Sequence, residues 1–254
     1  FSLLLVELNA EASRFLVGEK LTYSIYVGGI KIGFQTIEIR SIETLKGVEV
    51  YKIKGRSKTT PFISMFYRLD DKWSIYIDTN NLRPVRVEKN MVEGKKTDFI
   101  IYDIDQDNRK INIRNVESDI TMVVKADNDV FDIISMSFFF RENAPLYKNK
   151  GDIIVFDFLK SKSVQTVHFK NMGEYNIRIP ALAGRTLFNT NKYKKVGKTE
   201  IEFFVSNDKM NLPLKMTVNT RLTKNIRINI EVYLVEYSSE AWDNPFPAEK
   251  KKKK

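Results

Sequence analysis

Along most of this chain apolar residues alternate with polar ones, which is the pattern of half-buried β-strands. In residues 20–27 every second side chain is apolar. The pair Gly28-Gly29 follows, and two glycines suit the two-residue hairpin turn, whose central residues need positive φ. We therefore expect a return strand from Ile30, with a bulge near Gln35 where the phase of the apolar residues shifts.

Similar strands recur to the end of the chain, separated by short turns that contain Gly, Asn or Asp. They are expected at 48–58, 71–78, 84–92, 95–103, 109–116, 120–126, 153–159, 164–170, 174–180, 199–206, 213–222 and 226–237. Adjacent strands with short turns indicate an antiparallel meander. Because a sheet this long must curl or close to limit its edges, the expected fold class is all-β, mainly antiparallel, with a curved meander sheet or a barrel-like sheet.

One segment, residues 129–141, departs from the strand pattern and predicts a helix. It is apolar over most of its circumference, which indicates burial. Asp129 can cap its start, and Arg141 lies in the last turn, where a cation suits the helix dipole. We expect one buried helix near 129–141, packed against the concave side of the sheet.

The composition narrows the class of protein. The chain has 254 residues and no cysteine, which excludes disulfides, thiolate metal sites and cysteine nucleophiles. Its 42 basic and 32 acidic residues give a net charge of +10. Half of that excess is the terminal run Lys250, Lys251, Lys252, Lys253 and Lys254. The remaining body is mildly basic, so we expect no nucleic-acid partner.

The two ends predict the domain limits. Phe1–Val6 resembles the end of a signal-peptide apolar region, and Ala10-Glu11-Ala12 fits a small-x-small cleavage pattern. We expect residues 1–12 to be a residual signal peptide, 13–247 a single β-rich domain, and 248–254 a disordered basic tail. The protein is then periplasmic or otherwise exported. An ordinary first strand is the alternative for residues 1–12, and contact with an anionic membrane is the alternative for the tail lysines.

Catalytic and metal chemistry have weak support. His168 is the only histidine, lies in an apparent strand, and has no Gly-x-Ser-x-Gly motif to accompany it. Asp103, Asp105 and Asp107 resemble the opening of a calcium loop, but Asn108 stands where that loop has glycine and Arg114 where it has a bidentate glutamate. A hairpin turn is the simpler interpretation. We predict no catalytic residues, no metal site and no cofactor.

Apolar residues outside the strand pattern point to a ligand instead. The segment 60–67 is too apolar for an ordinary loop, and methionine with aromatic residues makes an adaptable apolar surface. A cap on the core is the alternative for this segment. The candidate ligand-binding residues are Phe62, Ile63, Met65, Phe66, Trp73, Phe138 and Phe140.

An ordered set of short motifs resembles the domain-of-unknown-function family DUF3108, a group of exported bacterial proteins. The set runs from Gly18-Glu19, Leu21-x-Tyr23 and Gly28-Gly29-Ile30-x-x-Gly33 through Trp73–Asp78, Leu82-x-Pro84, Asp132-x-x-Ser135, Arg141, Pro145-Leu146 and Gly151-Asp152 to Val205–Asp208 and Leu212-Pro213-Leu214. Phe204 stands where the family often has tryptophan. The resemblance implies export and a β-rich fold, and it supplies no catalytic residues.

Three functions therefore remain open. The first is a non-enzymatic envelope protein whose sheet and helix enclose an apolar groove for a lipid or acyl chain. The second is a structural or adaptor protein that binds another envelope component through a sheet edge. The third is a hydrolase of envelope polymers. A connected apolar cavity of at least about 300 Å³ would favour the first over the second.

Overall fold

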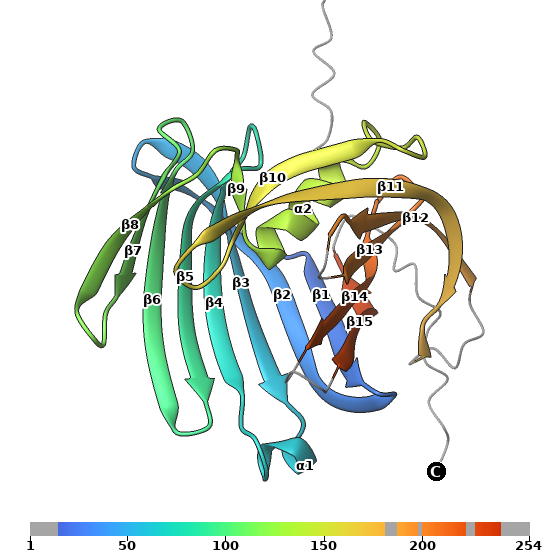
Figure 1. The fold of residues 1–254 in the computed structure, drawn as a ribbon, viewed down its shortest axis with the longest axis horizontal. Coiled ribbons are helices and arrows are strands. Elements are labelled where there is room, and N and C mark those ends of the chain that lie inside the picture. Colours follow the sequence, from blue (N-terminus) through green and yellow to red (C-terminus); the bar gives the residue numbers. More distant parts are fainter. Residues whose placement is uncertain (1–14, 181–186, 198–199, 222–226, 240–254) are drawn as a thin grey trace, which may run out of the picture.

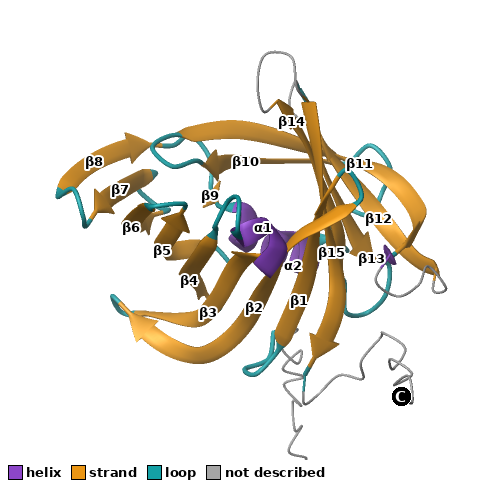
Figure 2. Ribbon diagram, turned by 90° about the horizontal axis from the view of Figure 1, so that it is seen from below, coloured by secondary structure: helices purple, strands orange, loops and turns teal. Residues whose placement is uncertain are grey.

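The fold is a single curved sheet of fifteen strands that wraps around one helix (Figures 1 and 2). It was obtained as a computed structural model, which describes residues 15–180, 187–197, 200–221 and 227–239. The predicted signal peptide and the lysine tail lie outside the described residues. No helix in the described ranges is both long and apolar enough to cross a membrane.

The strands of the first half are β1 (Lys20–Val27), β2 (Ile30–Leu45), β3 (Val48–Thr59), β4 (Asp70–Asp78), β5 (Pro84–Glu93), β6 (Lys96–Asp105), β7 (Lys110–Asn115) and β8 (Ile120–Lys125). Those of the second half are β9 (Val130–Phe131), β10 (Ile153–Leu159), β11 (Val164–Arg178), β12 (Leu187–Lys195), β13 (Glu200–Ser206), β14 (Pro213–Arg221) and β15 (Arg227–Ser238). Helix α1 (Pro61–Ser64) follows β3, and helix α2 (Ile133–Asn143) lies between β9 and β10.

The order of the strands explains the curvature. The chain starts in the middle of the sheet at β1, proceeds outward to β8 at one end, crosses to β9 at the other end, and returns to β15, which pairs with β1. Only residues 126–129 join β8 to β9, and a link of this length spans at most roughly 17 Å. The two ends of the sheet must therefore approach each other, so the predicted barrel-like, mainly antiparallel sheet is confirmed. The pairing of β9 with β10 is parallel.

The first hairpin forms as predicted, and its bulges lie elsewhere than predicted. Gly28 and Gly29 have φ of 57° and 81°, as a turn with two left-handed residues requires. The bulge expected near Gln35 is wrong, because the pairing of β2 skips Ile32 on one side and Arg40 on the other.

Two other strand predictions are also wrong. Residues 164–170 and 174–180 form one strand, β11, because Asn171-Met172-Gly173 is a bulge within it and not a turn. Gly173 has φ of 96°, a conformation that lets the strand continue past the extra residue. Strand β12 was not predicted, because its sequence Leu-Phe-Asn-Thr-Asn-Lys-Tyr-Lys-Lys is mostly polar.

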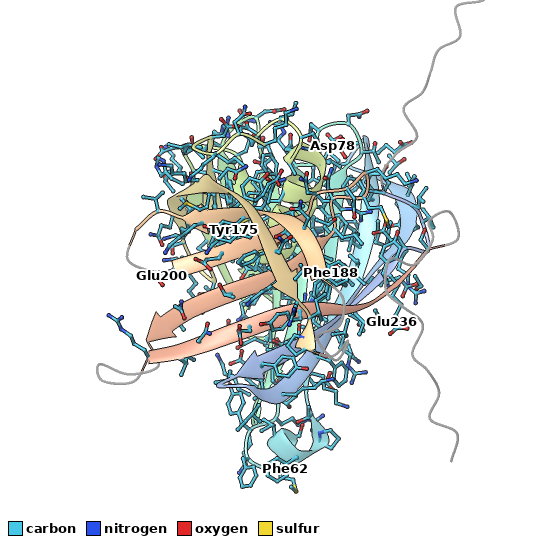
Figure 3. The ribbon with its side chains drawn as sticks, turned by 90° about the vertical axis from the view of Figure 1, so that its right-hand side faces the viewer. Phe62, Asp78, Tyr175, Phe188, Glu200 and Glu236 are labelled. Carbon is cyan, nitrogen blue, oxygen red and sulfur yellow. The ribbon has the colours of Figure 1, made fainter. Side chains whose placement is uncertain are left out.

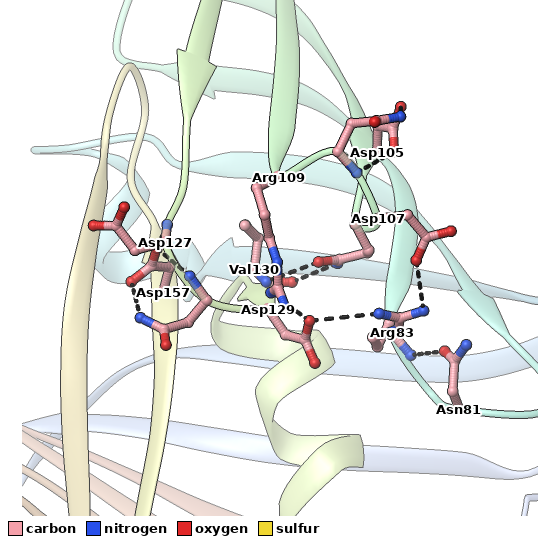
Figure 4. Close-up of polar contacts among 12 residues, drawn as sticks. Asn81, Arg83, Asp105, Asp107, Arg109, Asp127, Asp129, Val130 and Asp157 are labelled. Carbon is pink, nitrogen blue, oxygen red and sulfur yellow. Dashed lines mark hydrogen bonds and ion pairs between the residues drawn. The ribbon is translucent and has the colours of Figure 1, made fainter.

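A network of side chains joins the two ends of the sheet, and we call it the seam (Figure 4). The buried Gln106 amide donates to the carbonyls of Pro84 and Val130, and its oxygen accepts from the Val130 amide, each at 2.9 Å. The Asp157 carboxylate of β10 accepts from the backbone amides of Asp127 and Asn128 at 2.7 and 3.1 Å. These bonds hold the crossover between β8 and β9 against both halves of the sheet.

Candidate functional site

Helix α2 is the element around which an interior site could form. Its N-cap is Asp132, whose carboxylate accepts from the Ser135 amide, while the Ser135 hydroxyl accepts from the Asp132 amide. The predicted start at Asp129 is therefore wrong by three residues, because Val130 and Phe131 pair with β10 first. The second Asp132 oxygen lies 3.3 Å from Lys89 Nζ, which ties the start of the helix to β5.

The predicted packing of α2 on the concave side of the sheet is confirmed (Figure 2), and its apolar side chains enter two different core clusters. Ile134 and Phe138 belong to a cluster formed by residues of β1–β7 together with residues of β14 and β15, such as Leu214 and Val232. Met136 and Phe140 pack with residues of β10–β13. Phe140 is fully buried, and its ring stacks on Phe203 with centroids 5.2 Å apart.

An apolar recess of about 110 Å³ lies between the first turns of α2 and the inner face of the sheet. Its helical wall is Ile133, Ile134 and Ser137. Its sheet wall is Tyr23, Gln35, Ile37, Phe203, Pro213, Lys215, Met216 and Val232. Polar groups are few in this wall, and Lys215 Nζ is already paired with Glu231 at 3.0 Å. The recess can therefore receive an apolar group and offers little to a polar one.

A buried ion pair fixes the far end of α2. The Arg141 guanidinium bonds Glu19 of the segment leading into β1, and both side chains are almost wholly buried. Arg141 Nε also donates to the Met210 carbonyl at 3.1 Å, and the guanidinium lies 5.0 Å from the centre of the Phe15 ring. Burial beside this pair raises the pKa of Tyr23 well above its ordinary value. The sequence predicted Arg141 only as a cation that suits the end of the helix dipole. Its ion-pair partner Glu19 lies 122 residues away in the chain, so the pair could not be predicted.

The predicted ligand-binding residues occupy three separate places. Phe62, Ile63, Met65 and Phe66 lie on and just after α1, at the end of the molecule to which β3 runs (Figures 1 and 3). Trp73 lies in the core on the inner face of β4, where its indole covers Gly55, and a Cβ at position 55 would overlap the ring. Phe138 and Phe140 lie in two different core clusters. The structure thus does not gather the seven into one groove.

The acidic turn after β6 is a hairpin turn, as its simpler interpretation predicted. The Asp105 carboxylate accepts from the Asn108 backbone and side-chain amides at 3.0 and 2.8 Å. These bonds hold the pKa of Asp105 below its usual range. Asp103 pairs with Lys46, and Asp107 pairs with Arg83. Across the described ranges, no group of three or more His, Asp or Glu side chains is arranged to hold a metal ion.

The residues that line the recess could not be selected from the sequence. Tyr23 and Ile37 belong to strands in which apolar and polar residues alternate, so the sequence predicts that they point inward. The same pattern holds for every inward residue of the fifteen strands, so it does not single out those that line the recess. Which strands face α2 depends on the curl of the sheet, and that curl is set by pairings between distant parts of the chain.

Comparisons with known proteins agree with this architecture. A family model described as "Protein of unknown function (DUF3108)" matches residues 22–228. The crystal structure of a β-barrel-like protein of domain of unknown function DUF1849 from Brucella abortus is similar in fold, with a TM-score of 0.56 and 10% sequence identity. The match covers 87% of this chain and 97% of that one. No curated protein matches the chain.

Proposed function

We propose that this chain, which belongs to the DUF3108 family of proteins of unknown function, is an exported, non-enzymatic envelope protein that binds an apolar ligand in the α2 recess. The recess itself is the observation that supports this function. The walls of the recess are mainly apolar side chains. Apolar core clusters lie on both sides of α2, and the recess is a space left beside them.

The volume of the recess limits what it can hold. At about 110 Å³ it falls short of the roughly 300 Å³ that would have favoured a groove for a whole lipid. It is nearer to an engineered apolar cavity of about 150 Å³ that takes up benzene. The ligand we propose is therefore the end of an acyl chain or a similarly small apolar group, with the rest of the molecule held outside the recess.

The experiment is to fill the recess from its helical wall. Ser137 is half-buried there, and Ser137→Leu adds apolar volume where the ligand would lie. We expect binding of a fluorescent fatty-acid probe to weaken by about tenfold or more, as loss of a buried apolar contact of 1–3 kcal/mol would produce. The melting temperature should stay the same or rise, because the substitution fills space.

The matched control is Ser118→Leu, which adds the same side chain in an exposed turn. It should leave probe binding unchanged. If the wild type binds no probe, or if Ser137→Leu binds it as well as the control does, the recess is not a ligand site.

The second candidate, an adaptor that binds another envelope component, has a specific observation in β8. This strand ends the sheet, and no strand of the described residues pairs with its outer edge. Val123 of β8 is half-exposed. An edge of this kind can accept a strand from a partner.

Native mass spectrometry of protein purified from its own envelope separates the two candidate functions. A retained lipid favours ligand binding in the recess. A retained protein that is lost in the Val123→Lys variant favours an adaptor that binds through the β8 edge.

A further inference from the structure

A cluster of exposed apolar residues stands at one end of the molecule, on α1 and the adjoining hairpin. We define the α1 tip as Ile30 of the first hairpin together with residues 61–68. We propose that the α1 tip docks the protein onto an anionic lipid bilayer by inserting its aromatic side chains into the interface. This inference does not depend on the recess, because it concerns a different surface and a different measurement.

Several apolar side chains of the tip are largely exposed to solvent. Phe62, Met65 and Phe66 are 64%, 72% and 78% exposed, and Ile30 and Tyr67 are also exposed. Figure 3 shows Phe62 at the extremity of the molecule, beyond the ends of the strands. The Phe62 and Phe66 rings touch edge to face, with centroids 5.6 Å apart. Adjoining exposed apolar side chains of this kind mark an interaction surface, whereas single exposed apolar residues do not.

The tip is held rigidly in this exposed position. Thr60 caps α1 by accepting from the Ile63 amide at 3.4 Å, and its own amide donates to the Ile32 carbonyl at 2.9 Å. Buried Thr59 anchors the base, because its hydroxyl lies 2.7 Å from that of Ser64 and accepts from the Leu69 amide at 3.1 Å. The exposure is therefore built into the fold rather than left by a loose loop.

The tip is surrounded by an excess of positive charge. Lys31 follows Ile30, Arg68 ends the tip, and Lys95 lies in the neighbouring turn, whose Gly94 amide donates to the Arg68 carbonyl at 2.7 Å. Within the part of the chain that is described, no ion pair involves any of these three. Among the nearby acids, Glu93 is exposed beside Arg68, and Asp70 is already paired with Arg56 at 2.6 Å.

This combination fits a membrane better than a protein partner. Aromatic and apolar side chains with basic residues behind them are what interfacial anchors present to anionic bilayers. A standard protein interface buries about 800 Å² on each partner, with 20–30 residues a side. The α1 tip is a narrow projection of nine residues, so it can enter a soft bilayer but offers little area to a folded protein.

The experiment measures flotation of the full chain with vesicles of phosphatidylcholine alone or of phosphatidylcholine mixed with phosphatidylglycerol. We expect binding to the anionic vesicles, with weakening in about 0.5 M salt, where charges are screened. Phe62→Ser combined with Phe66→Ser should weaken it by about tenfold or more. Leu146→Ser, which alters an equally exposed leucine outside the tip, should have no effect.

A second readout reports insertion itself. In a Phe66→Trp variant, tryptophan emission should shift to the blue when anionic vesicles are added, and lipids brominated in the acyl chain should quench it. Unchanged emission, or flotation that survives the double serine variant, overturns the proposal. Flotation lost only when Lys250–Lys254 are removed also overturns it, because the tail would then be the anchor. Absence of binding to any vesicle leaves a protein partner as the explanation for the exposed tip.

Discussion

At the scale of single residues, the pair Glu19–Arg141 places two opposite charges in the protein interior. Glu19 Oε2 is buried without a hydrogen-bond partner among the described residues, so the carboxylate depends on Arg141 for compensation. Removing one member of a buried ion pair leaves a charge that the interior cannot solvate.

We therefore predict that Arg141→Met lowers the free energy of unfolding by about 3–5 kcal/mol. The double variant Glu19→Leu, Arg141→Met should recover much of this loss, because no unpaired charge remains. Chemical denaturation of the wild type, both single variants and the double variant measures the coupling. If the two single losses simply add, the pair is not coupled as its geometry indicates.

At the scale of elements, α2 contributes side chains to both apolar core clusters. Phe140 has no exposed surface and contacts Phe156, Phe169, Tyr193 and Phe203 from β10–β13.

Phe140→Ala should lower the free energy of unfolding by about 3–5 kcal/mol, since it leaves a cavity that rigid strands cannot fill. Thermal or chemical unfolding measures this loss. Leu146→Ala, at an exposed position, should cost less than about 0.5 kcal/mol. Similar losses in both variants would mean that the helix is not tightly packed.

The elements also show how far the sequence could lead. Alternation predicted most strands, and the double glycine predicted the first hairpin, because these signals are local. Strand β12 was missed, since its polar residues are held by neighbours that only the folded sheet supplies: Thr190 Oγ1, for example, donates to the Tyr175 carbonyl at 2.8 Å. The sequence predicts that the apolar residues of segment 60–67, of β4 and of the helix form one ligand groove. They lie instead in the tip, the sheet and the helix, and this separation depends on tertiary structure.

At the scale of the whole molecule, the seam links stability to pH. Burial opposes ionisation of Asp157, but bonds from Thr166 and from the amides of Asp127 and Asn128 outweigh it and hold the pKa of this carboxyl below its usual range. Because folding lowers this pKa, the ionised carboxylate stabilises the fold at pH values above the pKa of the unfolded state, which is about 3.9 for aspartate. That contribution is lost as the pH falls through the lower folded value.

We accordingly expect Asp157→Asn to be less stable than the wild type by about 1.5–3 kcal/mol at neutral pH, as for hydrogen bonds to a charged group. The difference should be constant above about pH 5 and should shrink below about pH 4. Melting temperatures of both proteins across this range test it, with Asp107→Asn, at an exposed carboxyl of the same region, as the control. A difference that stays constant down to pH 2 would show that the charge of Asp157 is not the cause.

The pairing of β1 with β15 has a consequence for how the protein is made. These strands begin and end the described fold and meet in the middle of the sheet, from Lys20 opposite Ser238 to Val27 opposite Ile230. Contacts between such distant parts of a chain slow folding. During synthesis β1 must wait for β15 before this edge is paired, and a chain cut before Arg227 would leave the edges of both β1 and β14 open to other chains. Pairing of β15 is therefore the step that covers the edges of β1 and β14 and joins the two half-sheets into one sheet.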